Sequence, residues 1–171
     1  ADGLLLTIAN ALSHDLYYKM IDPNAPTARR VAISKALLVV VALAAAGVAA
    51  QKPADILFLV SAAFSFAAAT FFPALVLGIF WKRANKWGAS LGMIAGLGVT
   101  FYYMVTTQPW MRGIFGVTSP IADNIWWGIQ PISAGLFGVP LGFLVIIVVS
   151  LITPAPKRET QELVEHVRYP N

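Results

Sequence analysis

The chain has 171 residues, of which 58% are hydrophobic and only 12% are charged, and its mean hydropathy is +0.71. Soluble domains carry about 25% charged residues, so this composition excludes an ordinary soluble protein and indicates an all-α membrane protein with several spans. The basic residues behind the net charge of +4 lie in short segments between apolar runs, so this charge does not indicate nucleic-acid binding. The chain has no cysteine and its two His are far apart in sequence, which excludes thiolate metal sites and clustered His sites.

Residues 1–20 are predicted to form a helix, because their apolar positions recur at helical spacing. The first apolar run, residues 4–12, is too short to cross a bilayer alone. We therefore expect the first span to be truncated, and we interpret the chain as the C-terminal fragment of a longer protein. The missing N-terminal part of that protein is then an expected partner of this chain.

The helix opens with a carboxylate, Asp2, which lies about 20 Å along the axis from Asp15 at ~1.5 Å per residue. That spacing places Asp2 inside the membrane. An intramembrane carboxylate is by default an ion, proton or substrate group, so Asp2 is the candidate cation-binding residue. The alternative is that Asp2 only caps a helix.

Four full spans are predicted to follow. The second of them contains Pro73, where a kink is expected. Residues 108–130 form the longest predicted loop, whose paired Trp126 and Trp127 indicate anchoring at the membrane interface. The predicted spans are residues 29–51, 54–81, 87–107 and 131–153, followed by a polar tail at 154–171.

Three glycines, Gly88, Gly92 and Gly96, recur every four residues in the third of these spans. Small residues at this spacing let two helix backbones approach closely, so we predict a helix-packing seam. The alternative is that glycine is simply common in membrane helices.

The basic residues divide unevenly between the two ends of the predicted spans. Of the 12 Lys and Arg, only Lys52 and Arg112 are expected on one side. Short basic loops stay in the cytoplasm, which predicts a cytoplasmic C-terminus and a bacterial inner-membrane location. The ten basic residues on the other side are Lys19, Arg29, Arg30, Lys35, Lys82, Arg83, Lys86, Lys157, Arg158 and Arg168.

No catalytic signature is found in the sequence. Ser13, His14 and Asp15 have the residue types of a hydrolytic triad, but helix neighbours point about 100° apart and cannot align in that way. No glycine-rich loop follows a strand, so no nucleotide site is predicted. We expect no enzyme activity and no organic cofactor.

The stretch Gly78 to Leu97, G-I-F-W-K-R-A-N-K-W-G-A-S-L-G-M-I-A-G-L, resembles a signature of the sodium:solute symporters. Residues 1–17, A-D-G-L-L-L-T-I-A-N-A-L-S-H-D-L-Y, resemble a family helix that ends in Asp-(Leu/Ile)-Tyr. The S-H-D-L-Y form is similar to the cation/acetate symporter branch. The resemblance covers essentially the whole chain.

The resemblance implies the C-terminal part of a LeuT-like inverted-repeat transporter, with one truncated and four full transmembrane helices. It also implies that the main sodium site, a pair of hydroxyls, lies just before Ala1, with Asp2 close to it. The implied function is sodium-coupled symport of a small monocarboxylate such as acetate. The alternatives are sodium or proton symport of proline, a sugar or pantothenate, or a membrane scaffold or sensor domain that transports nothing.

Overall fold

The computed structural model describes residues 2–22, 26–50 and 55–168, and every regular element within these ranges is helical. The chain divides into two compact units, Ala1–Pro53 and Ala54–Asn171. Four helices are long and apolar enough to cross a membrane, which confirms the prediction of an all-α membrane protein. They are Thr27–Ala50, Ile56–Phe80, Lys86–Thr107 and Pro131–Ile152.

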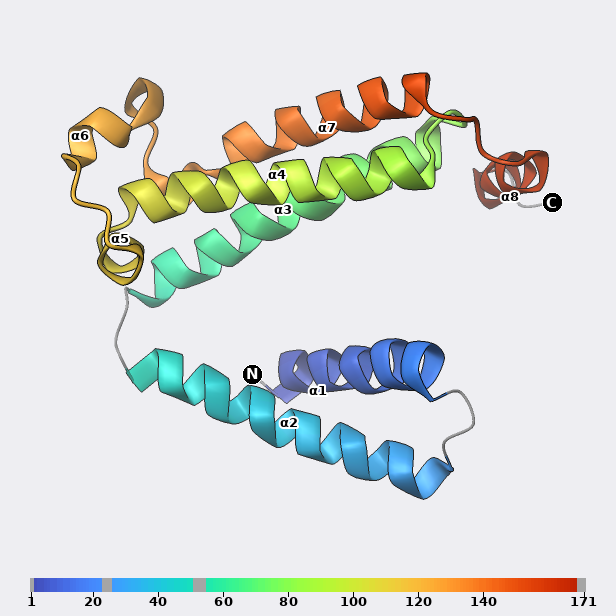
Figure 1. Ribbon diagram of the computed structural model, residues 1–171, viewed down its shortest axis with the longest axis horizontal. Coiled ribbons are helices and arrows are strands. Elements are labelled where there is room, and N and C mark those ends of the chain that lie inside the picture. The colour runs from blue at the N-terminus through green and yellow to red at the C-terminus, as the bar shows by residue number, and fades with distance from the viewer. Residues whose placement is uncertain (1, 23–25, 51–54, 169–171) are drawn as a thin grey trace. The chain divides into compact units, whose positions relative to one another are not determined.

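The first unit is a helical hairpin. Helix α1 (Asp2–Asn10) continues without a break into η1 (Ala11–Ile21), which has π-helical hydrogen bonding where the sequence predicts an ordinary helix. The chain then turns into α2 (Thr27–Ala50), which runs back along α1 and η1 (Figure 1). The described part of α2 buries no residue within the unit, so its apolar surface is available to lipid or to further protein.

The second unit is built on three long helices, α3 (Ile56–Phe80), α4 (Lys86–Thr107) and α7 (Gly135–Ile152). They lie side by side in Figure 1, and each contacts the other two. Helix α4 is the most buried of the three. Helix α3 continues through Pro73, whose buried ring packs beside Gly142 of α7.

Short helices occupy the segment predicted as a loop at 108–130 and the segment predicted as a polar tail. After α4 come α5 (Pro109–Phe115), α6 (Ile121–Asn124) and the 3₁₀ turns η2 (Trp126–Gly128) and η3 (Pro131–Ser133). The tail contains α8 (Arg158–Arg168), an 11-residue helix whose Arg158–Glu162 pair has (i, i+4) spacing. From the sequence this tail is described only as polar, because local helical pairs of this kind are weak signals in sequence.

Candidate functional site

The candidate cation ligand Asp2 is the first residue of α1, and its side chain lies outside the described part of the structure. One turn further on, the Thr7 hydroxyl donates to the backbone carbonyl of Gly3 over 2.8 Å. Both Thr7 and Asn10 are exposed on the surface of the first unit. The described polar side chains of α1, those of Thr7 and Asn10, therefore lie on faces that this unit leaves uncovered.

A polar groove of about 480 Å³ lies between η1 and α2. The wide turns of a π-helix often occur at functional sites, and here they border the groove. Among its described lining residues the one fixed charge is Arg30, whose guanidinium lies 3.6 Å from the centre of the Tyr18 ring. The groove thus offers hydroxyl, amide and guanidinium groups, which suit an anionic or hydroxylated ligand better than a metal. The other lining residues are Asn10, Ser13, His14, Thr27, Val31 and Ser34.

Ser13, His14 and Asp15 do not act as a catalytic unit in the structure. Ser13 is buried, whereas His14 and Asp15 are exposed and hydrogen-bonded side by side at 3.1 Å. Among the described residues, no three His, Asp or Glu side chains are close enough to hold a metal ion.

The predicted glycine seam lies at the contact of α4 with α7 and α3. Gly88, Gly92 and Gly96 are all buried. A Cβ atom built on Gly92 would lie 2.2 Å from Cγ1 of Ile146, and one on Gly96 would lie 2.2 Å from the carbonyl oxygen of Ala69. At these positions the helices are closer together than any side chain on α4 allows.

Helix α7 contributes small residues of its own to the same seam. A Cβ on Gly138 would lie 2.1 Å from the hydroxyl oxygen of Thr100 and 2.6 Å from the carbonyl oxygen of Gly96. The Thr100 hydroxyl donates back to the Gly96 carbonyl over 2.8 Å, so this buried polar group is satisfied within its own helix. At these glycines the backbones of α4 and α7 are in close contact, which is a packing role.

The basic loop between α3 and α4 is tied to the end of α7. Arg83 donates to the carbonyl oxygens of Leu151 (3.2 Å) and Thr153 (2.8 Å), which the last turn of α7 leaves without helical partners. Asn85 caps α4 by accepting from the Gly88 backbone N–H at 2.8 Å. Its amide nitrogen also donates to the Thr153 hydroxyl (2.7 Å). The loop and the C-terminal segment therefore lie at the same end of the second unit.

The opposite end of this unit has an aromatic cluster. Tyr103 is fully buried, and its ring lies 5.1 Å from that of Trp126 and 4.8 Å from that of Phe137. Trp126 is half-buried and packs against this cluster, while Trp127 is 86% exposed and suits the predicted interfacial role. The buried Arg112 donates to the carbonyl oxygens of Thr106 and Ser119 and so fastens the loop after α4.

Sequence patterns did not predict the groove, the Arg83 and Asn85 contacts, or the packed position of Trp126. We interpret Ser13, His14 and Asp15 from the sequence as a polar helix end, and two of them, Ser13 and His14, line the groove. The partners of Arg83 and Asn85 are separated from them by 68 to 70 residues in sequence, and no local pattern reports such pairs.

Comparison with known proteins gives a consistent family assignment. The sequence model of the sodium:solute symporter family matches residues 1–96. An uncharacterized symporter of Cupriavidus necator is 53% identical over 98% of this chain and 24% of its own length. No solved structure matches the chain.

More distant relatives have named substrates. A monocarboxylic acid transporter of Corynebacterium glutamicum is 31% identical over 83% of this chain and 26% of its own length. A high-affinity proline transporter of Bacillus subtilis is 30% identical over 90% of this chain and 28% of its own length. The chain thus spans about a quarter of the length of the curated relatives that it matches.

Proposed function

The chain belongs to the sodium:solute symporter family, and on this premise we propose that it forms the C-terminal part of a secondary transporter that imports a small monocarboxylate, such as acetate, with sodium. The observation that carries the substrate class is the S-H-D-L-Y ending of the first helix, which is similar to the acetate branch. The monocarboxylic acid transporter among the relatives supports it. The chain's role is transport and not catalysis.

A second candidate substrate is proline. The observation that favours it is the group of relatives named as proline transporters, one of them 30% identical to this chain. Both solutes carry a carboxylate, so the two proposals share the need for a cationic or amide-rich binding region. They differ in the ammonium group of proline, which requires an acceptor that acetate does not.

Sodium is the proposed coupling ion, and Asp2 is its proposed ligand in this chain. A carboxylate within a membrane helix is costly unless a cation or a donor faces it. The hydroxyl pair of the main sodium site, which the family resemblance implies, would lie just before Ala1. Asp2 would lie one turn or less from that pair, near where some family members hold a second cation. Sodium prefers oxygen ligands, and both the carboxylate and the hydroxyls supply them.

The proposed architecture is a LeuT-like inverted repeat, in which one bundle moves against another around a site near the bilayer midplane. In this arrangement the glycine seam keeps α3, α4 and α7 together as one rigid element. We propose that the basic segment at 82–86 and the C-terminal tail are cytoplasmic, in the inner membrane of a bacterium. Their common position at one end of the second unit supports this topology.

The test is uptake by the complete transporter in sealed proteoliposomes. An inward sodium gradient should drive accumulation of labelled acetate, and excess unlabelled acetate should compete with it more strongly than proline. Accumulation of proline alone would replace the first substrate by the second. Absence of gradient-driven uptake of either solute, by protein shown to be folded, would favour a scaffold or sensor domain and refute transport of both.

A further inference from the structure

A pocket of about 500 Å³ opens at the end of the second unit where the basic loop and the tail lie. Its deep wall consists of Ala74 and Gly78 of α3 and Ile146 of α7. Ala74 lies six residues before the end of α3, which is about 9 Å along a helix at ~1.5 Å per residue. The pocket therefore extends from the helix ends into the apolar part of the bundle.

The mouth of the pocket is basic and aromatic. Lys86 and Lys157 both line it, and no acidic side chain is among its described lining residues. Trp87 is 56% exposed, and the Lys86 ammonium lies 5.3 Å from the centre of a ring of this tryptophan. Exposed Trp beside Lys is typical of the level of lipid headgroups. The pocket thus has an apolar inner wall and a cationic mouth. This arrangement fits an amphiphilic molecule with an apolar chain and an anionic head group.

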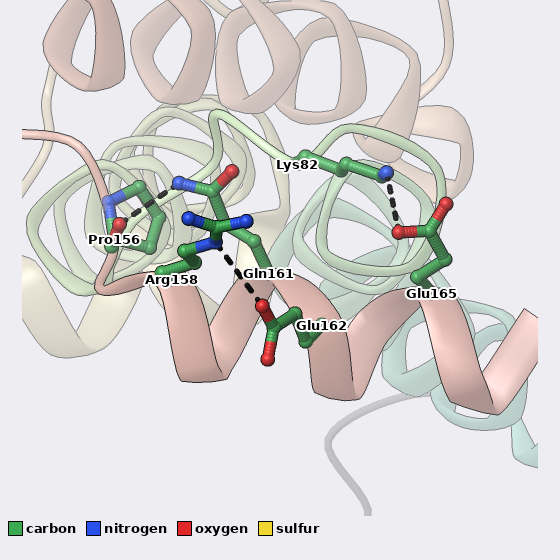
Figure 2. Close-up of polar contacts among 6 residues, drawn as sticks. All are labelled: Lys82, Pro156, Arg158, Gln161, Glu162 and Glu165. Atoms are coloured by element: carbon green, nitrogen blue, oxygen red, sulfur yellow. Dashed lines mark hydrogen bonds and ion pairs between the residues drawn. The ribbon is translucent and has the colours of Figure 1, made fainter.

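Helix α8 forms the outer wall of the pocket through Thr160 and Val164. Figure 2 shows the contacts that fix it, with Lys82 reaching Glu165 at 2.9 Å and the Gln161 amide donating to the Pro156 carbonyl at 2.9 Å. Arg158 pairs with Glu162 within α8 at 3.2 Å. Glu162 and Glu165 thus each have a basic partner, and Glu159, the remaining acidic residue of α8, is exposed and is not among the described lining residues of the pocket. The charged side chains that line the mouth are therefore Lys86 and Lys157.

We propose that this pocket binds one anionic phospholipid. The phosphate lies between Lys86 and Lys157, and one acyl chain enters along Gly78 and Ala74. Gly78 has nothing within 4 Å of the position of a Cβ atom, so its missing side chain leaves room for a chain. Basic pockets between membrane helices at the cytoplasmic side hold anionic headgroups by the same attraction. The bound lipid would join α3, α7 and α8.

The experiment is native mass spectrometry of the complete protein, titrated with phosphatidylglycerol and with phosphatidylcholine of the same chain length. Phosphatidylglycerol should bind preferentially. Each of Lys86→Gln and Lys157→Gln should weaken it about five-fold, and the double variant about 25-fold, from ~1 kcal/mol of attraction per basic residue. Lys35→Gln is the matched control, because it makes the same substitution at an exposed lysine of the first unit that is not among the described lining residues of the pocket.

A second pair of variants tests the acyl chain. Gly78→Leu should block binding of the lipid, whereas Gly98→Leu, which also enters open space but lies away from the pocket, should not. Equal binding of phosphatidylglycerol and phosphatidylcholine would overturn the proposal. A control variant that weakens lipid binding as much as the variant that it is compared with would also overturn it. So would glycerol phosphate competing as well as the intact lipid, because the pocket would then serve a soluble anion. None of these measurements depends on transport, so they are independent of the proposed symport.

Discussion

The packing of α4 against α3 can be tested by the substitution Gly96→Ala, which adds a single methyl group. Its Cβ would lie 2.2 Å from the carbonyl oxygen of Ala69 and 3.0 Å from that of Gly138. Both obstructions are backbone atoms, which cannot rotate away as a side chain does. To relieve this overlap, α4 must move about 1 Å away from α3. Such a movement weakens the other contacts between the two helices, because a gap of about 0.5–1 Å loses a quarter to a half of the dispersion energy of a contact.

The magnitude follows from overpacking, which typically costs ~1–3 kcal/mol. We expect the upper end, about 3 kcal/mol, for Gly96→Ala because of its backbone obstruction. The matched control is Gly98→Ala in the same helix, where nothing lies within 4 Å of the new methyl. Both variants gain the helix propensity of alanine, about 1 kcal/mol, so this term cancels in the comparison.

The assay is the thermal stability of the complete protein in detergent, followed as the loss of the folded peak in size-exclusion chromatography. Gly96→Ala should melt several degrees lower than the parent, whereas Gly98→Ala should melt at the same temperature or slightly higher. Equal melting temperatures for the two variants would refute the close approach of α4 to α3.

Three further predictions concern the ion, the topology and the loop end. In the complete transporter, Asp2→Asn should raise the sodium concentration for half-maximal uptake several-fold at normal expression, and an unchanged sodium dependence would reduce Asp2 to a helix cap. An impermeant maleimide should label Thr118→Cys from outside intact cells and Glu159→Cys only from the cytoplasmic side, since both positions are exposed. Labelling of Glu159→Cys from outside would reject the orientation. Arg112→Ala should destabilise the segment after α4 by about 2–3 kcal/mol, because a buried cation that donates to two carbonyls is lost, and should increase proteolysis there; unchanged proteolysis would contradict that anchoring role.

The sequence alone was sufficient for the elements whose signals are local. Apolar runs of about 20 residues predict spans, and four helices of that kind are present. Short basic segments predict the turns between spans, and the Lys82 to Lys86 segment does join α3 to α4. The spacing of Gly88, Gly92 and Gly96 also placed them on one face of a helix, because helical periodicity is itself a local property.

Only the tertiary structure decided what those faces meet. Gly92 lies against Ile146 and Gly96 against Ala69, and neither partner is encoded near its glycine in the chain. The same holds for the pocket, whose walls come from α3, α4, α7, α8 and the two segments that join α3 to α4 and α7 to α8. Apolar patterning buries a residue without selecting its neighbour, since the hydrophobic effect has no direction. The neighbours follow from the fit of backbones and side chains between helices, which depends on all of them at once.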